Sequence, residues 1–414
     1  MSQKSELVPK RRFKEFENAG DWEQRKLSEM ANFSKGNGYS KADLAEEGHP
    51  VILYGRLYTK YETIIKNVDT FAELKEKSVI SNGGEVIVPA SGETPEDISR
   101  ASVVDVSGVA LGGDLNIIKT NSELDPTFLA LTISNGSQQK EMTKRAQGKS
   151  VVHLHNSDLK EVNLLYPKLD EQVKIGSFFK KLDVAITLHQ RKLDKLKNLK
   201  QSYLYQMFPQ NGQKVPTLRF AGFSGDWGVH KLKDMASLMN GYAFKSENYV
   251  SNGIYKILTI SNVTGQRYTD MNETHSVDYL PSNIQSYQIL QQGDVLISLT
   301  GNVGRVSIVN EENCLLNQRV GLLKINSNVN QEYIYQCLNN KKFEEKMIKS
   351  GQGAAQLNIS KNDIEEYEIL LPSKKEQQKI GKYFKQLDET IEVQEQELEK
   401  LKNLKEAYLN EMFV

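Results

Sequence analysis

Three residues early in the sequence, Asp69, Glu73 and Lys75, fit the acidic–acidic–lysine spacing found in many nucleases. Carboxylates spaced in this way could hold a divalent cation that activates water for attack on a phosphodiester. Glu73 and Lys75, however, belong to the charge run 73–77, and mixed charges of this kind are typical of a solvated helix. A solvated helix is the better explanation. An autonomous metal-dependent nuclease stays open as an alternative, which cleavage by the purified chain would support.

Other catalytic and cofactor-binding patterns are missing from the sequence. The six histidines are scattered, and the two cysteines, Cys314 and Cys337, give no metal-ligand spacing. The neighbouring His153 and His155 are better explained as exposed or structural residues. The sequence contains no phosphate-binding Gly-x-x-x-x-Gly-Lys-Ser/Thr, no dinucleotide-binding glycine pattern and no Asn-Pro-Pro-Tyr motif of adenine methyltransferases. We therefore expect no catalytic residue, no metal ligand and no cofactor in this chain.

The composition is typical of a globular protein with more than one domain. The 414 residues suffice for two independent cores, with 26% charged and 38% hydrophobic residues. No apolar run approaches the roughly 20 residues that span a bilayer, and no secretory signal is evident. With only two cysteines, we expect a cytoplasmic protein without membrane contact. Lys plus Arg equals Asp plus Glu at 53 each, which argues against a nonspecific polyanion binder but not against a reader with local basic groups.

The strongest pattern in the sequence is a repeat with an offset of 205 residues. Residues 171–208 return as residues 376–413 with more than half of their positions identical, and Asp21-Trp22 returns as Asp226-Trp227. The stretches between these segments barely resemble each other. We therefore expect two tandem units, each a globular module followed by a long helix. The predicted boundaries are 1–167 for the first module, 168–208 for the first helix, 209–371 for the second module and 372–414 for the second helix.

The modules contain short, β-branched segments bounded by Gly, Asn or Asp, which are typical of strands. Examples are residues 254–258, 295–299 and 320–325 in the second module, with residues 86–88 and 115–118 in similar places in the first. The sequence therefore predicts a mixed α/β fold with β-rich modules.

Apolar residues in both long helices follow alternating steps of four and three, the heptad pattern of a coiled coil. The seam residues are Ile175, Phe179, Leu182, Ile186, Leu193 and Leu196 in the first helix, and Ile380, Phe384, Leu387, Ile391, Leu398 and Leu401 in the second. The middle of the first helix carries Arg191, Lys192 and Lys195, and that of the second Glu392, Glu395, Glu397 and Glu399. Antiparallel pairing would bring these opposite charges together, so we expect the two helices to pair. The alternative is that each helix is only the amphipathic edge of its own module.

Loops beside the predicted strands carry side chains that could read DNA. Arg, Lys, Asn and Gln reach base edges, and further groups hold the phosphates. The candidates are Arg56, Lys60 and Tyr61 in the first module, and Arg267, Arg305, Asn317, Gln318, Arg319, Gln352, Gln356 and Asn358 in the second. For any single residue a salt bridge or a turn is at least as good an explanation, so the group is more informative than its members.

The order of these motifs resembles the specificity (S) subunits of type I restriction–modification systems over the whole chain. The resemblance rests on the repeated Glu-Gln-x-x-Lys-Ile-Gly-x-[Phe/Tyr]-Phe helix starts, the Lys-Leu-Lys-Asn-Leu-Lys tails and the two Asp-Trp pairs, with residues 241–244 and 293–298 of the second module. It implies that each module is a target-recognition domain that reads one half of a bipartite site in double-stranded DNA. Unlike modules would then read an asymmetric, interrupted sequence, and the paired helices would act as a spacer.

The resemblance also implies partner subunits. Two methyltransferase (M) subunits would dock on the paired helices, bind S-adenosylmethionine and modify an adenine in each half-site. Restriction (R) subunits, with ATP and magnesium, would complete the nuclease, and the present chain would be catalytically silent. The first module departs more from the sequence pattern of the family. It has Ser-Gly-Glu at 91–93 roughly where the second module has Thr-Gly-Asn at 300–302, and Gly-Gly-Asp at 112–114 where the second has Asn-Gln-Arg at 317–319. A coiled-coil adaptor without a DNA role is the remaining alternative.

Overall fold

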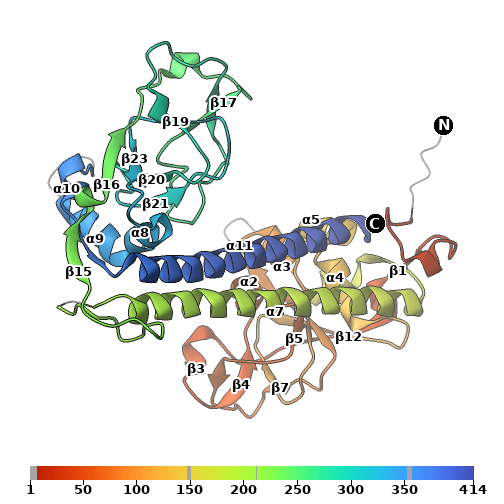
Figure 1. Cartoon of the computed structure of the whole chain (residues 1–414). Coiled ribbons are helices and arrows are strands. Elements are labelled where there is room, and N and C mark those ends of the chain that lie inside the picture. Colours follow the sequence, from red (N-terminus) through yellow and green to blue (C-terminus); the bar gives the residue numbers. More distant parts are fainter. Residues whose placement is uncertain (1–6, 147–150, 211, 352–356) are drawn as a thin grey trace. The chain divides into compact units, whose positions relative to one another are not determined.

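The computed structural model describes residues 7–146, 151–210, 212–351 and 357–414. The chain forms two compact units. Unit 1 is Met1–Arg191 with Gln396–Val414, and unit 2 is Lys192–Glu395. The two long helices are α7 (Leu169–Met207) and α11 (Lys374–Glu411), so each unit contains one module and a part of both helices (Figure 1).

Two five-stranded sheets form the module of unit 1. The first has the order β2 (Ala31–Lys35), β12 (Leu115–Thr120), β8 (Glu85–Pro89), β10 (Ser102–Val104) and β5 (Ile64–Ile65). The second has the order β3 (Leu44–Ala45), β6 (Phe71–Ala72), β4 (His49–Ile52), β11 (Ala110–Leu111) and β7 (Val79–Ile80). Neighbours are antiparallel except β10–β5 and β11–β4. Every residue of β8 is buried, so the first sheet lies at the centre of the module.

Unit 2 repeats this plan with two four-stranded sheets. The first has the order β16 (Ala236–Asn240), β23 (Val320–Ile325), β20 (Val295–Ser298) and β21 (Val306–Ile308), all antiparallel. The second has the order β18 (His275–Val277), β17 (Tyr255–Leu258), β22 (Cys314–Leu316) and β19 (Ile289–Leu290), with only β17–β22 parallel. The predicted α/β fold with β-rich modules is confirmed.

Short strand pairs and short helices complete each module. Two-stranded pairs form between β1 (Glu23–Lys26) and β14 (Asn163–Tyr166), between β15 (Gly228–Lys231) and β24 (Glu368–Leu371), and between β9 (Ser91–Gly92) and β13 (Val152–His153). The helices of unit 1 are α1 (Leu27–Met30), α2 (Arg56–Thr59), α3 (Pro95–Ile98), α4 (Pro126–Ile133), α5 (Gly136–Arg145) and α6 (Asn156–Lys160). Those of unit 2 are α8 (Gln331–Leu338), α9 (Lys341–Ser350) and α10 (Lys361–Glu365).

Within each unit, α7 and α11 run antiparallel (Figure 1). In unit 1, Lys405 binds Asp183 at 2.6 Å and Glu397 lies 3.6 Å from His189. In unit 2, both Lys200–Asp388 and Lys197–Glu395 are 2.6 Å long. Numbers rise along one helix as they fall along the other, so the predicted antiparallel pair is confirmed. Two of the predicted glutamates, Glu395 and Glu397, do face the other helix, but their partners are Lys197 and His189. In the described part of the chain, no ion pair of the predicted Arg191, Lys192 or Lys195 is found, because the facing positions fall elsewhere along the helix.

The seam is most deeply buried next to the modules. Ile175, Phe179 and Leu182 are buried in unit 1 together with Leu398, and Ile380, Phe384 and Leu193 are buried in unit 2. The remaining seam residues, Ile186, Leu196, Leu387, Ile391 and Leu401, are half-buried. Each helix therefore uses its first turns both for the coiled coil and for the core of its own module.

The last turns of each helix complete the core of the other repeat's module. In unit 1, Phe413 at the end of α11 is 5% exposed and packs on Phe128 and Phe179, with ring centroids 5.9 and 6.0 Å apart. In unit 2, Phe208 just after α7 packs in the same way on Tyr333 and Phe384, at 5.6 and 5.9 Å. All three positions correspond at the offset of 205 residues.

A buried ion pair fixes the start of each long helix. Arg12 donates from Nε and Nη2 to the two carboxylate oxygens of Glu171, at 2.7 and 2.6 Å. Arg219 binds Glu376 with the same geometry, at 2.6 and 2.7 Å. Both glutamates lie in the first turn of their helix, where the helix dipole also favours a negative charge. The two-pronged geometry ties the segment before each module to its long helix.

Candidate nucleic-acid interface

Several loops of unit 2 meet at one end of the sheet β16-β23-β20-β21. We call this surface the unit 2 edge and define it by Tyr242, Thr300, Gln318, Arg319 and Asn358. The amide of Gln318 donates to Tyr242 O at 2.9 Å, and the amide of Leu299 donates to Arg319 O at 3.0 Å. Thr300 forms a β-bridge with Asn358. These backbone contacts hold four segments that are far apart in the sequence in one surface.

The turn from Asn317 to Arg319 is shaped so that its polar side chains point outward. Asn317 is 7% exposed, and its Oδ1 accepts a hydrogen bond from the amide of Arg319 at 3.0 Å. Gln318 and Arg319 are exposed. Gly241 lies against this turn, because a Cβ at that position would come within 2.0 Å of Asn317 O. The turn is therefore a loop of fixed backbone with two exposed polar side chains, Gln318 and Arg319.

Unit 1 contains the same surface with different side chains. We define the unit 1 edge by Asn37, Ser91, Asp114 and His153. The amide of Ala90 donates to Asp114 O at 2.8 Å, and Ser91 pairs with His153 in the β9–β13 ladder. A Cβ on Gly36 would lie 1.9 Å from Gly112 O, just as at Gly241. His153 is exposed, stacks on His155 at 6.1 Å, and has its Nδ1 3.3 Å from Ser91 Oγ.

The two edges have similar backbone contacts and different side chains, and unit 1 additionally carries α3 (Pro95–Ile98) after β8, where unit 2 returns from β20 to β21 without a helix. At the offset of 205 residues, Asn37 corresponds to Tyr242, Asp114 to Arg319 and His153 to Asn358. Sequence reasoning selected Asn317, Gln318, Arg319 and Asn358 but missed Asn37, Asp114, Tyr242 and His153. The aligned loops 112–114 and 317–319 held the signal for Asp114. Apart from the repeat itself, the sequence held no signal for His153.

The three candidates in the first module lie away from the unit 1 edge. Arg56 is 7% exposed and binds Glu62 and Asp69, at 2.7 and 2.5 Å. Lys60 also binds Asp69, at 2.6 Å. The Tyr61 hydroxyl lies within hydrogen-bonding distance of Ala101 O and Ser134 Oγ, 3.2 Å from each. These contacts give all three a structural role inside the module, and their contact with DNA stays an untested prediction.

The nuclease-like spacing does not assemble into a site. Hydrogen bonds from Lys60 and then Arg56 lower the pKa of Asp69 to about 2. Lys75 binds Asp43 at 2.5 Å instead of approaching Asp69. The segment 73–77 is an exposed loop rather than the expected helix. In the part of the chain that the structure describes, no three or more His, Cys, Asp or Glu side chains are grouped so that they could hold a metal ion.

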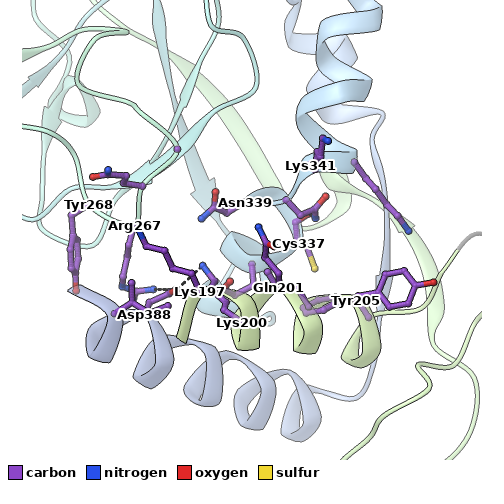
Figure 2. A pocket seen from close by; sticks show the side chains of 18 of the residues that line it. Lys197, Lys200, Gln201, Tyr205, Arg267, Tyr268, Cys337, Asn339, Lys341 and Asp388 are labelled. Carbon is purple, nitrogen blue, oxygen red and sulfur yellow. Dashed lines mark hydrogen bonds and ion pairs between the residues drawn. The ribbon is translucent and has the colours of Figure 1, made fainter. Parts of the chain in front are cut away.

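Arg267 belongs to a buried polar cluster rather than to the unit 2 edge (Figure 2). Its two terminal nitrogens donate to the Glu332 carboxylate at 2.6 Å each, and Nη1 also contacts Asp388 at 3.2 Å. Asp388 further binds Lys200 at 2.6 Å and accepts from Gln336 at 2.8 Å. Burial lowers the pKa of Arg267, but the hydrogen bonds and charge of Glu332 outweigh this effect and raise it overall.

A cleft of about 1250 Å³ adjoins this cluster, between α7, α8, α11 and the loop that carries Arg267 (Figure 2). Lys197, Lys200 and Arg267 line it, and all three are paired with carboxylates of the same unit. The charge of these three side chains is therefore neutralised locally, whereas Lys342, which also lines the cleft, contacts the amide oxygen of Gln210 at 2.9 Å.

The remaining candidates lie outside the two edges or outside the described residues. Arg305 stands where the loop after β20 returns to β21, and its Nε lies 3.4 Å from Glu344 Oε1. It lines a smaller cavity of about 300 Å³ with Gly265 and Lys341. Gln352 and Gln356 fall in a segment outside the described residues.

Comparison with known proteins shows the family to which the chain belongs. The family model described as "Type I restriction modification DNA specificity domain" matches residues 19–198 and again residues 224–403. The chain belongs to this family. Each match covers one module and most of the long helix that follows it, which is the same division that the repeat in the sequence indicates.

Full-length relatives carry the same description. The MjaVIII specificity subunit of a type I restriction enzyme from Methanocaldococcus jannaschii is 22% identical over 404 residues, 94% of this chain and 91% of the relative. The putative MjaX specificity subunit of the same organism is also 22% identical, over 94% of this chain and 92% of its own. The similarity to these specificity subunits thus extends over 94% of the chain.

Solved structures show the same fold. The S subunit of a type I restriction–modification system from M. genitalium matches 99% of both chains with a TM-score of 0.67 at 16% identity. A chain from a study of complex assembly and conformational transition of the type I R-M system matches with a TM-score of 0.51 at 18% identity, over 95% of this chain and 97% of its own. No helix in the described residues is long and apolar enough to cross a membrane.

We predict that Arg267→Gln lowers the free energy of unfolding of unit 2 by about 3 kcal/mol, because it removes the cation from the mostly buried carboxylate of Glu332 and from the buried Asp388. Hydrogen exchange of unit 2 amides across a urea series measures this effect. Arg305→Gln is the matched control, since its half-exposed pair with Glu344 is worth less than about 1 kcal/mol. An Arg267→Gln protein with unaltered stability and altered DNA sequence preference would assign Arg267 to DNA contact instead.

Proposed function

We propose that this chain is the DNA-reading, non-catalytic subunit of a type I restriction–modification complex, and that the unit 1 edge and the unit 2 edge each read one half of a bipartite site. The observation that carries the proposal is the pair of edges with similar backbone contacts and different side chains. Asn37, Asp114 and His153 differ from Tyr242, Arg319 and Asn358 in charge and in hydrogen-bonding capacity. Unlike edges recognise unlike half-sites, so the target is asymmetric.

The edges also have the chemistry that direct readout requires. Base edges in the major groove are distinguished by their pattern of donors and acceptors. The two edges present amide, carboxylate, guanidinium, imidazole and phenol groups on loops that backbone hydrogen bonds hold in place. A fixed loop loses little conformational entropy on binding, so each side chain adds more to discrimination. The proposed target-recognition domains are residues 1–167 and 209–371.

The two helical segments, 168–208 and 372–414, serve in this proposal as the spacer and as the surface for two methyltransferase subunits. Unit 1 exposes Val184, Leu188 and Leu404 on its helix pair, and unit 2 exposes Leu199 and Val393. Leu188 corresponds to Val393, and Leu404 to Leu199, at the offset of 205 residues. Exposed apolar residues at equivalent positions on both helix pairs fit two copies of one partner.

Chemistry belongs to the partners in this proposal. S-adenosylmethionine binds to the methyltransferase subunits, and ATP and magnesium bind to the restriction subunits, in the cytoplasm. Two observations argue against an autonomous nuclease: Asp69 is held by Arg56 and Lys60, and Lys75 is held by Asp43. A coiled-coil adaptor without a DNA role would not require two polar edges whose loops are held by backbone hydrogen bonds.

Mapping of methylated adenine across the genome tests the reading function. Cells that carry this chain with its methyltransferase subunit should show one motif with two specified parts of different sequence, separated by unspecified bases. Cells with the methyltransferase subunit alone should lack the motif. A continuous motif, a palindromic motif or an unchanged methylation pattern would contradict the proposal.

Charge substitution in the apolar patches tests the docking surface. We expect Leu188→Asp and Val393→Asp each to weaken the binding of one methyltransferase subunit by tenfold or more, roughly 1.4 kcal/mol, because a carboxylate would be buried without a partner. Native mass spectrometry should then find one methyltransferase subunit per chain instead of two, and none in the double variant. Ile254→Asp, at an apolar residue that is 61% exposed away from the helices, is the control. Two bound subunits in the double variant would place the docking surface elsewhere.

A further inference from the structure

One backbone position carries opposite charges in the two edges. Asp114 in unit 1 and Arg319 in unit 2 correspond at the offset of 205 residues. The carbonyl of Asp114 accepts from the amide of Ala90 at 2.8 Å, and that of Arg319 accepts from the amide of Leu299 at 3.0 Å. Each residue immediately precedes a fully buried one, Leu115 or Val320. The carbonyl of both residues is therefore held by the segment that follows the buried strand, although within the described residues only Arg319 also has its amide bonded by a side chain, that of Asn317.

Both side chains are exposed and available for a ligand. Asp114 and Arg319 are exposed at the surface. Across the described ranges of the chain, no hydrogen bond or ion pair of the Asp114 carboxylate or of the Arg319 guanidinium is recorded, in contrast to Arg56 and Arg267. A charged group without a partner keeps its full hydrogen-bonding capacity for the molecule that covers it.

The charge of Asp114 restricts what it can meet on DNA. A carboxylate only accepts hydrogen bonds, and the phosphate backbone repels it. In the major groove its preferred donor is the N4 amino group of cytosine. Arg319 presents two parallel donors, and the matching acceptor pair is O6 and N7 of guanine. The same position therefore meets complementary bases in the two units.

We propose that Asp114 and Arg319 are equivalent specificity determinants, with Asp114 reading a cytosine in the half-site of unit 1 and Arg319 reading a guanine in the half-site of unit 2. The inference rests on the proposed function of the two edges. Because the two side chains start from corresponding backbone positions, they contact the corresponding base pair in their respective half-sites. That base pair is G·C in both, with the two strands exchanged.

The test uses the complex of the full chain with its methyltransferase subunits. Methylation motifs and competitive binding to duplexes that differ at one base pair are measured for the wild type, Asp114→Asn and Arg319→Gln. An amide can donate as well as accept and pairs well with adenine. We expect Asp114→Asn to lose tenfold or more of its preference for cytosine over adenine at one position of the first half-site. Arg319→Gln should lose a similar factor for guanine at one position of the second half-site.

Each variant carries its own control, because the half-site read by the other unit should stay unchanged. Arg25→Gln, at an exposed arginine of β1 away from the edge, controls for the loss of a positive charge. Arg319→Lys keeps the charge and loses the two-pronged donor, so it should also relax the guanine preference. An Arg319→Gln complex that binds all sequences uniformly more weakly, with a shallower salt dependence and an unchanged motif, would make Arg319 a phosphate contact and overturn its assignment.

The remaining outcomes separate this inference from the proposed function. A two-part wild-type motif without cytosine and guanine at equivalent steps would overturn the inference and leave the reading function intact. An unchanged motif in Asp114→Asn would do the same. If the wild-type complex directs no two-part motif at all, the proposed function itself fails. A variant that lost both half-sites together would contradict the assignment of one residue to one half-site.

Discussion

The structure depends on the antiparallel pairing of the two long helices, by which the end of each helix packs into the module of the other repeat. Each module buries the first turns of its own helix, but the last turns that complete its core come from the helix of the other repeat. Phe413 fills this place in unit 1 and Phe208 in unit 2. Burying one such aromatic side chain contributes about 1.5–3 kcal/mol. The exchange lets one chain hold two copies of one architecture while each copy keeps its own surface.

The buried contacts are the same in the two repeats and fix the architecture. The exposed side chains of the edges differ between the repeats and are the ones proposed to contact DNA. The aromatic clusters and the helix ion pairs recur at the offset of 205 residues, and the Arg12–Glu171 pair recurs as Arg219–Glu376 with the arginine shifted by two further residues, because these contacts fix the same architecture twice. The two edges have similar backbone contacts but different side chains. A frame that is constrained by buried charges and close packing tolerates little change, whereas an exposed loop residue costs little to replace. A duplicated frame with two different edges is a physical basis for reading two different half-sites.

The fold was largely predictable from the sequence because its signals are periodic. The repeat, the heptad seam and the opposed charges each extend over many residues, and the antiparallel pair follows from them. The reading residues were less predictable. Arg56 and Arg267 look like base-contacting residues in their loops, yet Glu332, which neutralises Arg267, lies 65 residues further along the chain. A single sequence does not reveal such a partner. Asp114 was missed for the opposite reason, since an acidic residue beside two glycines suggests no DNA contact by itself, and only its alignment with Arg319 at the offset of 205 residues points to it.

The central claim is that each module is completed by the end of the other repeat's helix, and a single repeat tests it directly. Residues 209–414 contain the second module and α11 but lack the end of α7. Their own helix end can replace it from a second copy, because Phe413, Lys405 and Tyr408 correspond to Phe208, Lys200 and Tyr203. Sedimentation equilibrium of this fragment, at concentrations where it is folded, should give a homodimer. A stable, folded monomer would contradict the account.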